Sequence, residues 1–290
     1  MTILALAAAM LYGTADFLGG VASRRASVFA VLALTVPAGA VVMVLVALLG
    51  QVPALGGLLG HGGLGTPASA GDWSAVGWAA ASGVCGAFGL IAFYTGFASA
   101  PISVVAPVAA LVSAVLPVGV AIAGGERPAA TVIAGGLICL VAIVVVSAQP
   151  ADHVGPEQGE GPAGEGRAGR IRPVAPGRLR ALGYGAAAGA GFGLFFIFLT
   201  NAGQSGVLWP VAISRSAGTV VAFGIALATR TRLRFGRGGI TAIALISGSI
   251  DAAANVCYIL ATRVGLFGLA VVITSLYPGM TVLLARVAWT

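Results

Sequence analysis

Residues 82–117, SGVCGAFGLIAFYTGFASAPISVVAPVAALVSAVLP, contain two long apolar runs joined by a short turn. Residues 247–282, SGSIDAAANVCYILATRVGLFGLAVVITSLYPGMTV, align with them without a gap at an offset of 165, so that Gly83 falls on Gly248. Both segments predict two consecutive helices, because their apolar runs are much longer than the roughly 10-residue alternating strands of membrane barrels. The match indicates that the helix pair is duplicated.

The beginnings of the two halves also align, at an offset of 180. The spacing small-xxx-small occurs in both, and it lets membrane helices approach closely. Its members are Ala5, Ala9 and Gly13 in the first half and Gly185, Gly189 and Gly193 in the second. Two segments that match in the same order favour a duplicated unit of five helices.

Composition places these helices in a bilayer. Hydrophobic residues make up 59% of the 290 residues and charged residues only 8%, whereas soluble domains carry about 25% charged residues. This excludes a soluble enzyme and a nucleic-acid-binding protein. About 20 apolar residues cross a bilayer, and nine such runs are predicted, at approximately 3–22, 28–50, 73–98, 101–123, 128–148, 181–200, 208–229, 239–262 and 266–288. Pro107, Pro117 and Pro278 are expected to kink their helices.

Residues 149–180 form a linker rich in Pro, Gly and Arg, which separates a first five-helix repeat, 1–148, from a second repeat, 181–290, with four predicted helices. An odd number of helices per unit inserts the second unit upside down relative to the first. The chain is therefore predicted to be an all-α polytopic membrane bundle of inverted repeats, an arrangement common in secondary transporters that places the binding site near the bilayer midplane.

The run 94–128, YTGFASAPISVVAPVAALVSAVLPVGVAIAGGERP, resembles the EamA-like branch of the drug/metabolite transporter superfamily, as do LYGTADFLGGVASRR at 11–25 and SLYPGMTVLLAR at 275–286. The resemblance implies ten helices, in two inverted repeats around a central cavity, and transport of small metabolites or drugs. The tenth helix expected from the family is missing, because the counterpart of Glu126 would be residue 291. Truncation and a natural nine-helix form both stay open. In the second case the uncovered groove predicts a homodimer.

Ionisable groups inside a membrane are costly and mark functional sites. Asp16 and Asp251 are predicted to lie about 18–20 Å from the starts of their helices, near the middle of the bilayer. Arg215 lies about two turns into the run 208–229. Its depth matches that of Asp251, so the two side chains are predicted to form an ion pair, since an unpaired charge there would cost at least a few kcal/mol.

Polar residues share faces with these acids. Asp251, Asn255 and Tyr258 follow the spacing i, i+4, i+7, and Tyr12 precedes Asp16 by four residues. Each face either binds a polar solute or is satisfied inside the bundle, and Asp16 has Arg24 as an alternative structural partner. Tyr277 is expected to line a cavity. The candidate substrate-binding residues are Tyr12, Asp16, Arg215, Asp251, Asn255, Tyr258 and Tyr277.

These features favour a secondary transporter that moves a small polar or amphipathic metabolite by alternating access. The chain has no lysine and hence no Walker loop, and a membrane carboxylate such as Asp16 or Asp251 could couple export to protons. No catalytic set, metal site or cofactor is expected, and the protein is not predicted to be an enzyme. A lipid-carrier flippase and a non-transporting structural membrane protein are the alternatives.

The expected location is a bacterial cytoplasmic membrane, with a small solute and the lipid bilayer as partners and no nucleic acid. Loops after odd-numbered predicted helices hold 11 arginines, and loops after even-numbered ones hold 2. The positive-inside rule then puts the odd loops in the cytoplasm and the N-terminus outside. This orientation differs from the cytoplasmic termini that the resemblance implies.

Overall fold

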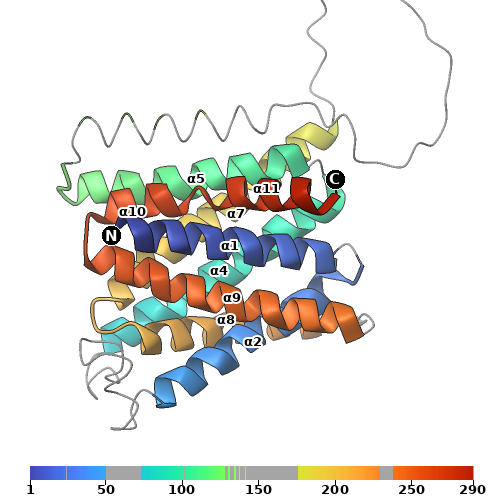
Figure 1. Ribbon diagram of the computed structural model, residues 1–290, viewed down its shortest axis with the longest axis horizontal. Helices are drawn as coiled ribbons and strands as arrows, with labels where there is room; N and C mark the ends of the chain where they lie inside the picture. The colour runs from blue at the N-terminus through green and yellow to red at the C-terminus, as the bar shows by residue number, and fades with distance from the viewer. Residues whose placement is uncertain are drawn as a thin grey trace, which may run out of the picture.

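The computed structural model describes residues 1–23, 25–49, 73–100, 102–127, 176–228 and 238–289, and the single residues 130, 134, 137 and 141. These residues form a helical bundle that contains no strand in the described ranges (Figure 1). Its helices are α1 (Thr2–Ser23), α2 (Val28–Leu49), α4 (Trp73–Ser99), α5 (Ile102–Ala123), α7 (Pro176–Ala202), α8 (Leu208–Ala228), α9 (Gly238–Arg263), α10 (Phe267–Thr274) and α11 (Tyr277–Trp289).

Seven helices in the described ranges are long and apolar enough to cross a membrane: α1, α2, α4, α5, α7, α8 and α9. Large apolar side chains cover their outer surfaces, as at Leu45, Val220 and Leu227, which are 54%, 72% and 81% exposed. Such a surface suits hydrocarbon rather than water. The predicted all-α class is confirmed for the described residues, and seven helices of this length and hydropathy indicate a membrane-embedded protein.

Most predicted helices agree with the structure to within a few residues. The predicted helix 128–148 and the linker 149–180 lie mostly outside the described residues, so the total of nine spanning helices stays a prediction. Helix α7 begins at Pro176, five residues earlier than expected. Proline suits the first position of a helix, where its missing N–H costs nothing.

The prediction of one helix over 266–288 is wrong, because this segment is two helices, α10 and α11. Pro278 has no N–H and cannot donate to the carbonyl of Thr274, which interrupts the helical ladder. Around the break the Leu276 N–H donates to the carbonyl of Ile273 at 3.2 Å and the Gly279 N–H to that of Leu276 at 2.9 Å, and α11 begins at Tyr277. By contrast, Pro107 and Pro117 lie inside the continuous helix α5.

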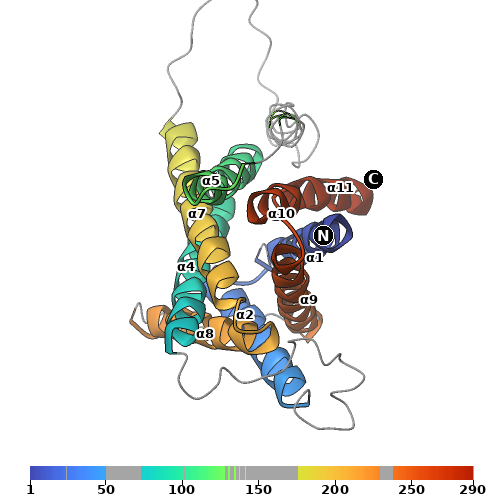
Figure 2. The ribbon, with the colours of Figure 1, turned by 90° about the vertical axis from the view of Figure 1, so that its left-hand side faces the viewer.

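Each side of the bundle is built from both halves of the sequence (Figure 2). On one side, α7 packs along α4 and α5. On the other side, α1 packs along α9, α10 and α11. Helices α2 and α8 pack against each other and join the two sides, because α8 also contacts α4 and α2 also contacts α9.

Glycines allow the closest crossings. The α-hydrogen of Gly83 in α4 faces the carbonyl of Ser214 in α8, and that of Gly248 in α9 faces the carbonyl of Thr35 in α2, with no room for a methyl group at either place. In α7, a methyl group on Gly189 would lie 2.6 Å from the carbonyl oxygen of Ala109 in α5. The close approach predicted from the small-residue spacing is thus confirmed for α7.

Gly83→Ala is expected to lower the unfolding temperature by several degrees, because the added methyl group forces α4 away from α8 at a cost of about 1–3 kcal/mol. Gly77→Ala is the matched control in the same helix, since a methyl group there meets no atom within 4 Å. Circular dichroism of the purified variants in detergent measures both temperatures. Equal values for the two variants would contradict the close crossing.

The two halves also meet at the end of the bundle where the chain begins. The Glu126 carboxylate, just after α5, accepts hydrogen bonds from the backbone N–H groups of Phe267 and Gly268 at 2.9 and 3.0 Å. Leu266, at the N-cap of α10, provides no side-chain cap. Glu126 therefore satisfies the free donors of α10 from a distant part of the chain and places a negative charge at the helix start, where it is stabilising.

Glu126→Ala is expected to destabilise the protein by about 1–2 kcal/mol, the usual cost of removing a capping side chain. Arg127→Ala is the control, because it removes the neighbouring exposed charge without touching the cap. Thermal unfolding in detergent separates the two, and amide hydrogen exchange of α10 should increase only in the Glu126 variant. Unchanged exchange in α10 would show that the cap is not needed.

Candidate functional site

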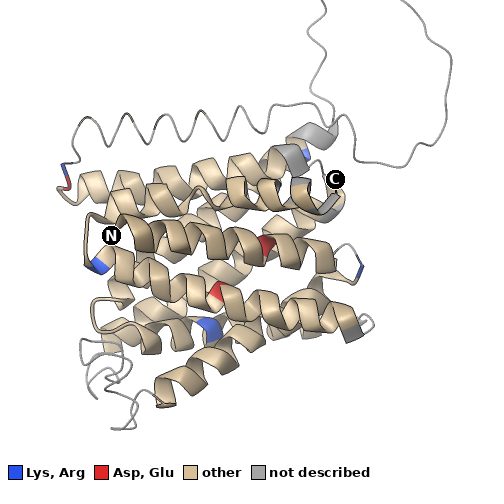
Figure 3. Cartoon of the chain, viewed as in Figure 1, with Lys and Arg blue, Asp and Glu red and all other residues tan. Residues whose placement is uncertain are grey.

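Charged residues of the described ranges lie at the two ends of the bundle, apart from a few in its middle (Figure 3). The central ones are Asp16, the fifteenth residue of α1, Arg215, the eighth of α8, and Asp251, the fourteenth of α9. At about 1.5 Å per residue, all three lie at least about 10 Å from the nearer end of their helices. The middle of the bundle is therefore the candidate site.

The predicted ion pair between Arg215 and Asp251 is confirmed. The two side chains are 11% and 18% exposed, so they are largely removed from solvent. They come from α8 and α9, which both pack against α2. The pair bridges two helices, and a buried charge that loses its partner is strongly destabilising.

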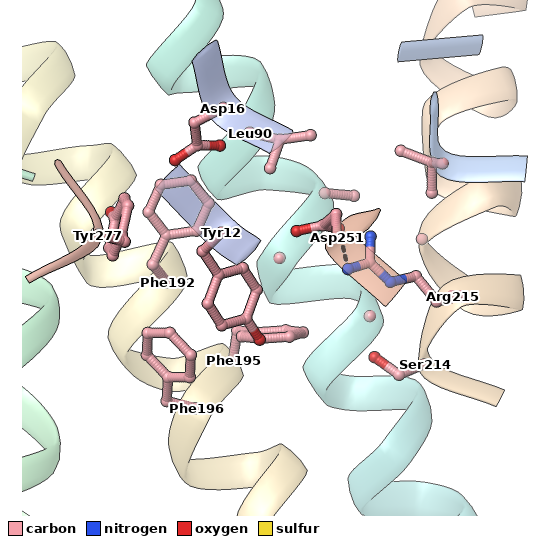
Figure 4. A pocket seen from close by; sticks show the side chains of 15 residues that line it. Tyr12, Asp16, Leu90, Phe192, Phe195, Phe196, Ser214, Arg215, Asp251 and Tyr277 are labelled. Atoms are coloured by element: carbon pink, nitrogen blue, oxygen red, sulfur yellow. Dashed lines mark ion pairs between the residues drawn. The ribbon is translucent and has the colours of Figure 1, made fainter. Parts of the chain in front are cut away.

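The ion pair lies in the wall of a cavity of about 60 Å³ (Figure 4). On this measure one water molecule needs roughly 10–15 Å³, so the cavity has room for several waters or part of a small solute. One wall is polar and includes Tyr12, Asp16, Arg215 and Asp251. The facing wall belongs to α4 and α7 and is apolar, with Leu90, Phe192, Phe195 and Phe196.

Asp16 differs from Asp251 in forming no ion pair with any described residue. Its side chain lines the cavity from α1, and within the described part of the chain its carboxylate makes no ion pair and no hydrogen bond. Arg24, the structural partner that the sequence left open, lies outside the described residues. Among the described side chains in the cavity, Asp16 is thus a charge that is free to bind a ligand.

A second, smaller cavity adjoins the first. It shares Asp16, Arg215 and Asp251 and extends to Tyr94, near the end of α4, and to Ser247 in α9. The Ser247 hydroxyl donates to the carbonyl of Ala15 at 2.8 Å and ties α9 to α1. The three central charged residues therefore line both cavities.

Asn255 and Tyr258 share the helix face of Asp251 but do not line either cavity. Asn255 accepts a hydrogen bond from the Tyr12 hydroxyl and donates to the carbonyl of Asp251 at 2.9 Å. The fully buried Tyr258 donates to the carbonyl of Phe196 at 3.1 Å. These bonds match the alternative in which the face is satisfied inside the bundle. Contact of either residue with a solute stays a prediction.

Tyr277 lines the cavity from the first position of α11, directly after the helix break. Its ring packs edge-on against Tyr12 with centroids 6.2 Å apart. The Thr281 hydroxyl, one turn later, donates to the carbonyl of Gly13 at 3.1 Å and holds α11 against α1. The interruption before Pro278 thus places a tyrosine in the wall of the site.

Buried apolar side chains pack more continuously toward the end of the bundle where the chain begins. One cluster of buried side chains joins α1, α2, α7, α8, α9, α10 and α11 there; it includes Tyr12, Met43, Leu199, Val207 and Ile259. At the opposite end the described apolar residues form two separate clusters. One contains Phe93 and Val105 with their neighbours on α2, α4, α5 and α7, and the other joins α1, α2 and α9.

The aromatic wall is the part of the site that the sequence reasoning missed. The repeat alignment contained a signal, because at an offset of 180 Phe192 is the counterpart of Tyr12 and Phe196 the counterpart of Asp16. Equivalent positions of the two halves therefore contribute to one cavity, polar in one half and aromatic in the other. No group of three or more His, Cys, Asp or Glu side chains suited to a metal ion occurs among the described residues.

Comparison with known proteins gives a fold and no family. No family model and no curated protein matches the chain. A solved structure, described only as the crystal structure of a protein, is similar with a TM-score of 0.68 and 19% sequence identity. The match covers 99% of this chain and 87% of the other. At this identity the likeness shows the fold alone.

Proposed function

We propose that this protein is a secondary transporter that moves a small polar or amphipathic solute by alternating access. The observation that carries the proposal is the cavity in the middle of the bundle, where Asp16, Arg215 and Asp251 lie far from both helix ends. Charges at this depth are costly in a membrane protein and mark solute or ion pathways. A purely structural bundle has no need of a hollow lined by a free carboxylate.

The proposal includes two inverted repeats. Support comes from paired contacts, since α4 packs on α7 as α9 packs on α1, and α8 packs on α4 as α2 packs on α9. The close crossings pair in the same way, with Gly83 at Ser214 and Gly248 at Thr35. The end of α5 lies at the start of α10, so these counterparts run in opposite directions (Figure 1).

Alternating access is supported by the unequal apolar packing toward the two ends of the bundle. The apolar cluster around Tyr12 and Leu199 packs toward one end, and the Glu126 cap holds α5 against α10 there. The smaller cavity extends toward the other end. The broken helix α10–α11 beside the site is a further feature of transporters, in which interrupted helices border the binding site.

Asp16 is the residue proposed to couple transport to protons. A carboxylate without a partner in a low-dielectric site gains most from binding either a proton or a cation. The titratable and charged groups that face it are Tyr12 on its own helix, Tyr94 from α4, Arg215 from α8, Asp251 from α9 and Tyr277 from α11. Competition between proton and solute for Asp16 would link their movements.

Membership of the EamA-like branch of the drug/metabolite transporter superfamily, and residence in a bacterial cytoplasmic membrane with the N-terminus outside, belong to the same proposal. Their support is the sequence resemblance at 94–128 and the distribution of arginines. A ten-helix transporter of inverted repeats would place its site between the halves, as the cavity here suggests.

The test is uptake into liposomes that contain the purified protein, with an imposed pH gradient. Labelled amines, amino acids, carboxylates, sugars and nucleosides are offered in parallel. Saturable, protein-dependent uptake of one class that ends when the gradient is collapsed is the expected result. Movement of a fluorescent lipid between leaflets without solute uptake would favour a flippase, and neither activity would favour a structural protein.

A further inference from the structure

The charges around the cavity are unbalanced. Among the described side chains that line it, Asp16 and Asp251 are acidic and Arg215 alone is basic. Arg215 forms its ion pair with Asp251 and acts on Asp16 only through space, so among the described residues Asp16 has no ion pair of its own. In a site that excludes bulk water an uncompensated charge is costly, and a ligand that carries one positive charge removes this cost.

An anionic ligand would not find a matching group. Arg215 is engaged with Asp251 through Nη2, and its Nε has no hydrogen-bond partner and almost no exposed surface. An anion at the remaining Nη1 would lie beside the carboxylate of Asp251 and in the same cavity as that of Asp16, and both would repel it.

The wall that faces the charges suits an apolar body with a cationic head. Phe192, Phe195 and Phe196 are at most 9% exposed, and they line the cavity together with Leu90 and Ala87. Aromatic faces attract organic cations and also pack well against hydrocarbon. A wholly polar solute, such as a sugar, would make no apolar contacts with this wall. Its hydroxyl groups would also lose their hydrogen bonds to water without gaining others from the aromatic rings.

We infer that the solute of the proposed transporter is an amphipathic organic cation, with its ammonium group on Asp16 and its apolar body against Phe192, Phe195 and Phe196. This inference rests on the proposed transport function for its physiological meaning, but the site itself is defined by binding. The Arg215–Asp251 pair stays intact beside the bound head group. Its role is to hold the polar wall in place and to keep anions out.

Binding of four matched probes to the purified protein in detergent tests the inference. Phenethylammonium carries a phenyl body and one positive charge, phenylethanol is its neutral counterpart, phenylpropanoate its anionic one and phenylalanine its zwitterionic one. Isothermal titration calorimetry at a pH where the amine is charged is expected to give a Kd for phenethylammonium at least about tenfold lower than for the other three.

Variants separate the head group from the body. Asp16→Asn should raise the Kd for phenethylammonium at least about tenfold and leave that for phenylethanol within about threefold. Phe195→Leu should raise the Kd for phenethylammonium by about threefold to tenfold. Phe198→Leu is the matched control on the same helix, because the Phe198 ring packs against Trp78, with ring centroids 5.3 Å apart, and does not line the cavity.

Equal binding of amine and alcohol by the unaltered protein would overturn the inference, and so would tightest binding of the anion or the zwitterion. Because these comparisons need no variant, they hold even if Asp16→Asn fails to fold. Binding of the amine without uptake into liposomes would leave the cation site standing and refute the transport function. Uptake of another solute class, with no amine binding, would support the transport function and refute the cation site.

Discussion

Asp251→Asn is expected to lower the unfolding free energy by about 3 kcal/mol, since it leaves the charge of Arg215 without its partner in the middle of the bundle. The estimate follows the burial of the pair, whose side chains are 11% and 18% exposed. Uptake into liposomes should be lost in the same variant. Chemical or thermal unfolding in detergent measures the first effect, and the liposome assay measures the second.

The double variant Asp251→Asn with Arg215→Gln is the control. Both charges are then absent, so stability should return most of the way to that of the unaltered protein while uptake stays low. The difference between the single and the double variants is the coupling energy of the pair. If Asp251→Asn alone retained full stability and full uptake, neither the structural nor the functional role of the pair would stand.

Asp16→Asn is expected to have the opposite effect on stability and the largest effect on transport. The variant removes a charge that has no partner in the described part of the chain, so the unfolding temperature should stay the same or rise. Accumulation driven by a pH gradient should fall by at least about tenfold, because the amide cannot exchange a proton at the working pH.

Asp16→Glu is the matched variant for this position, since it keeps the carboxyl group and changes only its reach. Its uptake should still respond to the pH gradient, though with a weaker apparent affinity. Measurement of uptake against external pH for both variants distinguishes loss of proton coupling from a change in the shape of the binding site. Gradient-driven accumulation by Asp16→Asn at the unaltered rate would exclude Asp16 as the coupling residue.

The helices and their approximate ends were predictable because the bilayer imposes a simple length rule on apolar runs. The ion pair was predictable for a related reason. A charge in hydrocarbon needs a partner at the same depth, and depth can be read from position along a helix, as for Arg215 and Asp251. The close packing of α7 followed from the four-residue spacing of Gly185, Gly189 and Gly193.

The limits of such reasoning appear at the helix break and along α9. Pro278 was expected to bend a helix, but whether a proline bends or ends it depends on which other groups satisfy the freed carbonyls. Asn255 and Tyr258 share a face with Asp251, but they lie further along the helix, where apolar side chains from other helices pack around Tyr258 and neither residue lines a cavity. The spacing of residues along a helix shows which of them share a face, but it does not show how far a cavity extends along that face.

The sequence by itself determined the all-α class of the protein, the proposed duplication of its helices, and the pairing of Arg215 with Asp251, which avoids the cost of an unpaired charge in the membrane. These follow from local properties, namely the length, hydropathy and periodicity of each segment. Only the tertiary structure decided that Phe192 and Phe196 of one half face Asp16 of the other, and that Glu126 caps a helix 141 residues further along the chain. The reason is that such contacts depend on how the helices cross, which their glycines permit but do not dictate.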